Sequence, residues 1–345
     1  MFLASDNEIV SAAIAERHPG RIVRFPQLAR NSENALVELL LLSRMPAMVL
    51  TRSSTFSEVA WWMGGAKASV VGLIGKHGDN PRDYAPGIHE AAPGILDIIV
   101  PTKYNFCMLR RLGLHEHLDD ISELANASAS YTKHYVRLMR GLVMLDIGAN
   151  IGLSCLGIAK LGYKVFAFEP NPECAAVLLA TSAINNLDID VVEAAVGDID
   201  CLTKLYVPKN RSDNTALNSE ASNYNVQRDS VQSYQVNQIT IDSWWHSQTK
   251  VDPADIGLIK MDIQGAETKA FQGMRRFLSA CRPFARLLIE FEIEPILLEK
   301  QNSSSADLFE IIESCGMGVF TTADLSQRLT KYMHTGPMVL FAAFA

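Results

Sequence analysis

An apolar segment that ends in a glycine turn is the feature that most constrains the fold of this chain. Residues 142–147 predict a buried strand, residues 154–161 predict an apolar helix, and D-I-G-A-N-I-G at residues 146–152 joins them. Gly148 allows a tight turn, Gly152 allows the helix to pack closely, and the free amides at the helix start face the crevice. Because position 150 is Asn, this is not the G-x-G-x-x-G fingerprint of dinucleotide sites. A strand, a glycine turn and a helix in this order indicate a nucleotide-binding α/β unit.

A carboxylate closes the next predicted strand. Residues 165–168 are apolar and are followed by Glu169. In a βαβ unit this position lies beside the glycine turn, at the height of a ribose, and a carboxylate accepts two hydrogen bonds from a cis-diol. The alternative interpretation of Glu169 is a solvated strand-end residue or a helix cap.

Further apolar strands are predicted at residues 190–193, 256–261 and 287–291, with helical patterns between them. Strands that are apolar on both faces and separated by helices favour a parallel sheet that is covered on both sides. The predicted fold class is therefore α/β.

Charge and cysteine usage narrow the classes of function. The chain has 31 Lys+Arg against 38 Asp+Glu, a net charge of −7, and lacks the basic excess typical of proteins that bind nucleic acid. No apolar stretch approaches the roughly 18 residues of a membrane span. The 6 cysteines are scattered, without a C-x-x-C pair or zinc-ligand spacing, which favours reduced thiols. We therefore expect a cytoplasmic protein with no nucleic-acid partner and no membrane span.

The length of 345 residues exceeds what one ordinary domain requires. Residues 1–75 alternate helical and strand-like patterns and predict a partial α/β module. Residues 76–100 are rich in turn-forming residues and predict a linker, which leaves residues 101–345 as the main domain. Within that domain, residues 209–238 are rich in Asn, Ser and Gln and predict a solvated loop or irregular hairpin that shapes acceptor recognition.

Four ordered motifs between residues 141 and 300 resemble the FkbM family of S-adenosylmethionine-dependent methyltransferases. They are D-I-G-A-N-I-G, V-F-A-F-E-P-N-P, A-A-V-G-D and I-K-M-D-I-Q-G-A-E. The resemblance implies a class I methyltransferase fold, a Rossmann-like seven-stranded sheet whose last strand, Met338–Phe344, runs antiparallel. It also implies S-adenosylmethionine as the cofactor. Gln264 stands where the family usually carries Glu, so no role is carried over to that side chain.

The resemblance also implies cofactor contacts. The glycine turn would lie against the methionine end, with Asp146 orienting the turn near the cofactor amine. Glu169 would hold the ribose hydroxyls, and residues 195–198 would flank the adenine. The predicted cofactor-binding residues are Asp146, Gly148, Asn150, Gly152, Glu169, Asn171, Ala195 and Asp198.

Methyl transfer from a sulfonium to a hydroxyl is an in-line displacement that needs an aligned acceptor and a proton acceptor. Such groups belong at the carboxyl ends of strands near the cofactor, and the predicted catalytic residues are Asp262, Glu267 and Glu290. Glu292 alternates with Glu290 along its strand, so that one of the two faces the crevice. Two alternatives stay open: Glu267 as a helix-start acid, and a divalent ion held by the three carboxylates. The preferred interpretation includes no metal.

Two aromatic side chains precede the first predicted strand. Tyr131 and His134 could reach over the cofactor, although a surface helical residue is the favoured interpretation of His134. The pair Trp244-Trp245 is expected to pack under the sheet.

A second resemblance lies near the amino terminus. S-S-T-F-S at residues 53–57 follows a predicted helix and short strand, as in the nucleotide-sugar half of fucosyltransferase-like glycosyltransferases. Its hydroxyls and amides suit a diphosphate, or simply cap a helix. This resemblance directs the acceptor prediction towards a small-molecule or glycan hydroxyl, that of a carbohydrate or glycosylated metabolite. The alternatives are a nucleotide-sugar-dependent glycosyltransferase and a non-catalytic cofactor-binding partner subunit, and the sequence predicts no oligomeric state.

Overall fold

The computed structural model describes the chain from residue 121 to 344, apart from residues 209–210, 223–230, 249–250 and 332–335. Before residue 121 it describes the segments 32–45, 47–51, 69–73, 96–101 and 107–111, with a few single residues. Two compact units are formed, Met1–Val100 with Arg110–Leu112 and Pro101–Leu109 with Gly113–Ala345. Among the described residues, no helix has the length and apolar character needed to cross a membrane.

The amino-terminal part of the chain contains helix α2 (Ser32–Leu42) and a small sheet. The sheet has the order β1 (Ala47–Thr51), β2 (Ser69–Leu73), β3 (Leu96–Pro101) and β4 (Cys107–Arg111). Strand β3 occupies the end of the segment predicted as a linker. Most of that linker, and the predicted phosphate-binding residues 53–57, lie outside the described residues.

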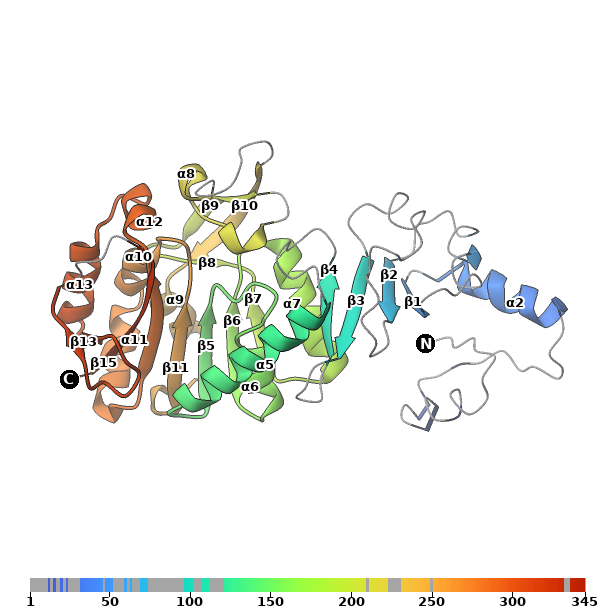
Figure 1. Cartoon of the computed structure of the whole chain (residues 1–345), viewed down its shortest axis with the longest axis horizontal. Helices are drawn as coiled ribbons and strands as arrows, with labels where there is room; N and C mark the ends of the chain where they lie inside the picture. Colours follow the sequence, from blue (N-terminus) through green and yellow to red (C-terminus); the bar gives the residue numbers. More distant parts are fainter. Residues whose placement is uncertain are drawn as a thin grey trace. The chain divides into compact units, whose positions relative to one another are not determined.

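The larger unit is built on a mixed sheet of 8 strands, coloured green to red in Figure 1. Its order is β14 (Arg328–Leu329), β13 (Met317–Phe320), β15 (Met338–Phe344), β12 (Leu288–Ile293), β11 (Ile256–Met261), β5 (Val143–Ile147), β6 (Lys164–Phe168) and β7 (Ile189–Val192). Strands β12, β11, β5, β6 and β7 are parallel to one another, whereas β15 runs antiparallel to β12 and β13. The α/β fold, its seven main strands and the antiparallel last strand are as predicted, and the short β14 is an addition at the edge.

Helices cover both faces of this sheet. One face packs on α9 (Ile241–Ser247), α10 (Glu267–Gln272), α11 (Arg275–Cys281) and α13 (Ser305–Ser314) through one continuous apolar core. Trp244 of α9 contacts Phe166 and Phe168 edge to face, with ring centroids 5.0 Å apart in both pairs. The packing role predicted for this tryptophan is therefore confirmed.

The opposite face carries α5 (Ile121–Leu138), α6 (Leu156–Lys160) and α7 (Pro172–Asn185) (Figure 1). Successive side chains of a strand point to opposite faces. In β5, Leu145 and Ile147 therefore enter the core on α9–α11, whereas Asp146 points to the face covered by α5 and α6. A buried carboxylate in the middle of a sheet needs a compensating charge, and Lys260 of the neighbouring strand β11 provides it for Asp146.

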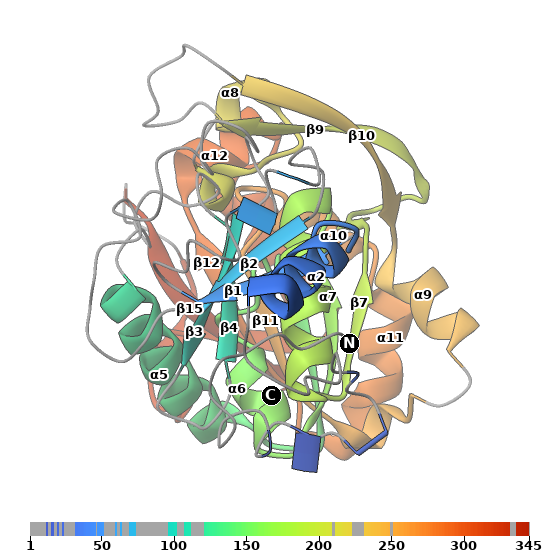
Figure 2. The same cartoon turned by 90° about the vertical axis from the view of Figure 1, so that its right-hand side faces the viewer.

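An insertion between β7 and α9 forms an arm, defined here as residues 201–239, at the top of both views (Figures 1 and 2). Its strands β9 (Cys201–Pro208) and β10 (Val231–Ile239) are antiparallel, and β8 (Ala195–Val196) extends their sheet. Two short helices, η3 (Ser212–Asn214) and α8 (Ser219–Ser222), lie between β9 and β10. Of the two alternatives predicted for residues 209–238, the hairpin therefore agrees better with the described residues than the loop does. Its second strand is rich in polar residues because most of its side chains remain partly exposed.

Candidate active site

A cavity of about 780 Å³ opens at the carboxyl ends of β5, β6, β11 and β12. The chain passes from β5 to β6 on one side, while β11 pairs with β5 on the other. Open α/β sheets bind ligands at such a reversal of strand order. Helix α5 and the arm complete the wall.

The glycine turn forms one side of this cavity. Gly148 has φ +79°, and a Cβ atom there would lie 2.0 Å from the carbonyl oxygen of Asp262. The amides of Gly148 and Ala149 donate to the carbonyl oxygen of Phe168 at 3.0 and 3.1 Å. Only glycine fits this close approach, which fixes the turn against the ends of both neighbouring strands. Gly152, at φ +91°, instead packs against α7 and does not line the cavity.

Glu169 lines the cavity beside this turn, as predicted from the order of strand and acid. Its Oε2 accepts a hydrogen bond from the Asn150 amide at 2.7 Å, and its Oε1 accepts one from the Asn171 amide at 2.8 Å. Burial raises the pKa of Glu169 to about 7, although both amides favour the charged form. A carboxylate offers about four lone-pair sites, so capacity for two ligand hydroxyls remains. This geometry fits the ribose of S-adenosylmethionine.

Lys260 compensates the buried Asp146 and was not identified from the sequence. Its Nζ lies 3.4 Å from Asp146 Oδ1 and donates to the carbonyl oxygen of Gly148 at 2.7 Å. Ser154 Oγ donates to the other oxygen of Asp146. Desolvation opposes the charge of Lys260, but Asp146 and Asp262 outweigh it and raise its pKa. The sequence feature that could have identified Lys260 is the presence of a lysine inside an otherwise apolar predicted strand.

Acidic side chains gather at the part of the cavity that β11 and β12 form. Asp262 follows β11, accepts a hydrogen bond from Gln264 Nε2 at 3.1 Å, and lies close to the Glu292 carboxyl group. Burial and the charge of Asp262 raise the pKa of Glu292 to about 7. Glu290 also lines the cavity, and its Oε2 lies 2.6 Å from His134 Nε2. Both Glu290 and Glu292 therefore reach the site. The prediction that only one of them faces the crevice was wrong, because side chains two positions apart on a strand point to the same face.

Five predicted site residues lie outside the cavity lining, and two of them are Gly152 and the fully buried Asp146. Glu267 is buried outside the cavity lining, and its Oε1 accepts from the amides of Ile263 and Gly265 at 3.3 and 3.4 Å. Burial raises the pKa of Glu267 to about 8. Asn171 caps α7 by accepting from the Glu173 amide at 3.1 Å. Asp198 is exposed beyond Ala195, which does line the cavity.

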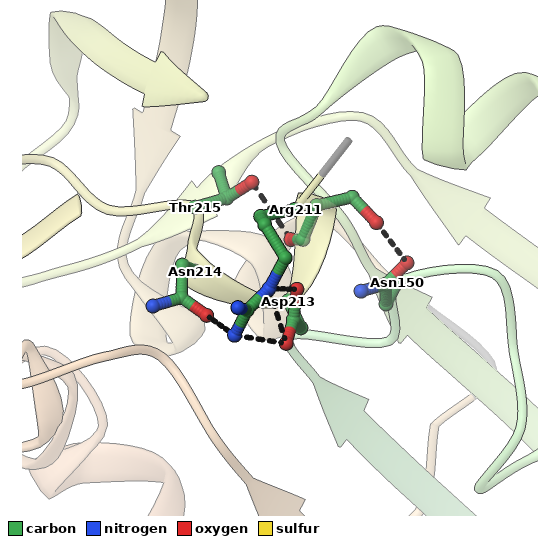
Figure 3. Close-up of polar contacts among 6 residues, drawn as sticks. Asn150, Arg211, Asp213, Asn214 and Thr215 are labelled. Carbon is green, nitrogen blue, oxygen red and sulfur yellow. Dashed lines mark hydrogen bonds and ion pairs between the residues drawn. The ribbon is translucent and has the colours of Figure 1, made fainter. Parts of the chain in front are cut away.

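The arm adds polar groups that sequence reasoning did not name. Asp213 and Thr215 line the cavity, and Ser212 Oγ lies 3.4 Å from Asn150 Oδ1 of the glycine turn (Figure 3). Arg211 donates from Nε and Nη2 to Asp213 at 3.1 Å each, and from Nη2 to Asn214 Oδ1 at 2.9 Å. The turn at η3 is therefore stabilised by hydrogen bonds from Arg211 to side chains of the same turn. Within the described part of the chain, no three His, Cys, Asp or Glu residues are grouped to hold a metal ion.

The order of the strands and the cavity between a glycine turn and acidic strand ends define a Rossmann-like methyltransferase of class I. Residues 146–317 match the family model of the methyltransferase FkbM domain. The chain carries this domain, and it is an S-adenosylmethionine-dependent methyltransferase.

Solved structures that match the chain were also found, and the following three are of low similarity. Precorrin-6y C5,15-methyltransferase from Geobacter metallireducens is 15% identical over 64% of this chain and 89% of its own, with a TM-score of 0.32. A TehB-like SAM-dependent methyltransferase from Corynebacterium glutamicum is 15% identical over 64% and 88%, with a TM-score of 0.33. Magnesium protoporphyrin IX methyltransferase from Synechocystis PCC 6803, solved with bound SAM, is 8% identical over 65% and 81%, with a TM-score of 0.32. At these values the assignment rests on the family match, and no curated protein matches the sequence.

Proposed function

We propose that this methyltransferase is an O-methyltransferase acting on a hydroxyl group of a carbohydrate or glycosylated metabolite. The observation that carries the proposal is the contact between the glycine turn and the acidic strand end, where Gly148 packs on the Asp262 carbonyl. An acceptor hydrogen-bonded to Asp262 would therefore lie next to the methyl donor. Proximity and alignment of this kind contribute a large part of the rate of a displacement reaction.

The charges of the cavity support a hydroxyl acceptor. Asp262, Glu292 and Asp213 accept hydrogen bonds, whereas the two nearby cations are engaged by the protein itself. Lys260 contacts Asp146 and the Gly148 carbonyl, and Arg211 contacts Asp213 and Asn214. An anionic acceptor such as a sugar phosphate or uronate would meet the carboxyl groups of Asp262 and Glu292, which disfavour it. A neutral polyol offers the donors that these groups require.

The cofactor would be held by the residues on the other side of the cavity. We assign the ribose hydroxyls to Glu169, the methionine end to the turn at Gly148 and Asn150, and the adenine to the wall at Ala195. Bound there, the cofactor supplies an electrophilic methyl group. Asp146 orients the turn through Lys260 rather than by direct contact, because it is fully buried and does not line the cavity.

The first experiment tests cofactor binding. Isothermal titration of the full chain with S-adenosylhomocysteine should give binding that is lost in Glu169→Ala. Binding that is unchanged in this variant would overturn the assignment of the ribose site.

The second experiment tests the acceptor. The protein is incubated with radiolabelled S-adenosylmethionine and neutral glycosides, amino sugars, uronates or sugar phosphates. Label is expected in base-stable ethers of the neutral glycosides. Asp262→Asn should reduce this transfer, whereas Asp255→Asn, which directly precedes the amino end of the same strand, should not. Transfer to nitrogen or to a carboxylate would contradict the proposal.

A further inference from the structure

A histidine and a glutamate from distant parts of the chain meet at the cavity wall. His134 lies on α5 and Glu290 on β12, and both line the cavity. The Nε2 and Oε2 atoms are 2.6 Å apart, while 47% of the histidine side chain and 7% of the glutamate side chain are exposed. A buried carboxylate thus holds one ring nitrogen of an imidazole that remains open to the cavity.

The surroundings restrict this imidazole to one orientation. The Tyr135 ring meets it edge to face, with centroids 4.8 Å apart at 76°, and the Tyr135 hydroxyl also interacts with Glu290. Besides Glu290, the charged group that faces His134 is Arg137 of its own helix. Among the described residues, the Nδ1 atom has no hydrogen-bond partner, so it is the nitrogen left for a ligand. Positioning of a histidine by a carboxylate fixes both its tautomer and its direction.

We propose that His134 is the proton acceptor for methyl transfer and that Glu290 is its positioning residue. This inference rests on the proposed function, since it requires an acceptor that carries a hydroxyl. Glu290 holds the Nε2 proton, and the Nδ1 lone pair takes the hydroxyl proton of the acceptor.

The step balances without any further reactant. The acceptor oxygen forms a bond to the methyl carbon as the methyl–sulfur bond breaks, and the bonding electron pair stays on the sulfur, which becomes a neutral thioether. The hydroxyl proton passes to Nδ1, giving an imidazolium whose charge is compensated by Glu290. Because the side chain is half exposed, the proton then leaves to solvent.

The carboxylates are less suited to this role. Asp262 and Glu292 lie close together and compete for protons, so part of their capacity as bases is used. Glu267 does not line the cavity. Asp262 and Glu292 bind and orient the acceptor, whereas His134 provides an imidazole, the side chain whose ordinary pKa lies nearest to neutral pH.

The pH dependence follows from the hydrogen bond. Glu290 raises the pKa of His134 above its ordinary value, against the opposing effects of desolvation and Arg137. The unprotonated base is required, so kcat should rise with pH through the raised pKa and then level off. In Glu290→Gln this rise should move to lower pH, towards the ordinary histidine value of about 6.5, with a lower plateau.

The test combines kinetics, ligand binding and histidine titration. His134→Gln should lower kcat by roughly 10²–10⁴-fold and abolish the rising limb, with S-adenosylhomocysteine affinity unchanged. The control is His246→Gln, an exposed histidine on α9, which should behave as the unsubstituted protein. NMR titration of the His134 ring in the full chain should give the same midpoint as the kcat profile, and this midpoint should fall in Glu290→Gln.

The outcomes separate the inference from the proposed function. If His134→Gln binds S-adenosylhomocysteine normally and keeps kcat and its pH profile, His134 is not the base. If this variant fails to fold, the NMR midpoint in the unsubstituted protein decides, and a midpoint that differs from the kinetic one overturns the inference. If the unsubstituted protein methylates no hydroxyl although the His134–Glu290 titration is as expected, the proposed function fails instead.

Discussion

At Gly148, adding a single Cβ atom is expected to affect both protein stability and cofactor binding. A Cβ atom would lie 2.0 Å from the Asp262 carbonyl oxygen, in addition to the strain of φ +79°. Gly162 offers a matched control, because its φ is +94° but no atom lies within 4 Å of the added Cβ. Gly162→Ala should lower the free energy of unfolding by about 1–3 kcal/mol, the cost of backbone strain alone.

Gly148→Ala should cost more than this and should also abolish binding of S-adenosylhomocysteine. Denaturant unfolding and calorimetric titration of both variants measure the two effects. If both variants lose the same free energy of unfolding and both still bind S-adenosylhomocysteine, the glycine turn tolerates displacement from the end of β11.

Lys260 is the buried cation on which the interior carboxylate depends. Lys260→Met should destabilise the protein by about 3–5 kcal/mol, because Asp146 is left buried without its counter-charge. Lys164→Met removes a lysine whose partners Asp188 and Asp190 are largely exposed, and it should cost about 1 kcal/mol or less. Urea unfolding provides the comparison, and the double variant Asp146→Asn/Lys260→Met should be less destabilised than the sum of the single changes. Additive effects would argue against direct coupling of the pair.

Glu169 should make cofactor binding depend on pH. Burial raises its pKa to about 7, so the folded protein keeps the proton longer than the unfolded chain does, and its contribution to stability falls as pH rises towards 7. The charged form is the better acceptor for ribose hydroxyls. Affinity for S-adenosylhomocysteine should therefore be about tenfold weaker at pH 6 than at pH 8.

The proton released on binding can be measured directly. Calorimetric titration at pH 6 in buffers of different ionisation enthalpy should report proton release, and Glu169→Gln should not show it. The same release from Glu169→Gln would place the titrating group elsewhere.

At the scale of secondary-structure elements, the arm couples two parts of the site. Its η3 turn contributes Asp213 and Thr215 to the cavity wall, and Ser212 contacts Asn150 in the glycine turn (Figure 3). Because the turn is held by Arg211 rather than by a deep core, we expect it to determine acceptor fit more than protein stability.

Arg211→Ala should raise the acceptor KM by up to about tenfold, which corresponds to ~1.4 kcal/mol, while the affinity for S-adenosylhomocysteine changes little. Lys204→Ala, an exposed cation on β9 of the same arm, is the control and should leave both constants unchanged. Steady-state kinetics with the identified acceptor checks this. A loss confined to cofactor affinity would mean that the arm serves the cofactor rather than the acceptor.

At the scale of the whole molecule, local patterns in the sequence predicted the sheet and half of the site. The apolar strands, the glycine turn and the acid after β6 follow one another closely in sequence, so their proximity could be inferred. His134 and Glu290 are 156 positions apart, and only the tertiary fold brings them together. Lys260 was missed for the same reason, since its partner lies on another strand and a lone lysine does not reveal it. Asp198 was misplaced because a side chain just after the adenine wall can turn to solvent.

The division of the chain leads to a further prediction. Every cavity-lining residue among those described lies at or after Ser130, and the FkbM domain match begins at residue 146. We propose that the amino-terminal 75 residues form a separate module that is not needed for cofactor binding. A chain that starts at Pro101 should bind S-adenosylhomocysteine within about threefold of the full chain in calorimetric titration, and a complete loss would contradict this independence.

The row of charges in the sheet has a consequence for how the strands find one another during folding. Lys260 stands directly opposite Asp146 on one neighbour and Glu290 on the other. A slip of β11 by one residue would turn the lysine into the apolar core on the far face and leave Asp146 buried without its counter-charge. Apolar strands of similar length can pair in several registers of comparable energy. The row of Asp146, Lys260 and Glu290 favours one of these registers over the others. The charged residues that support the site therefore also determine the register of β5, β11 and β12, the strands that build it.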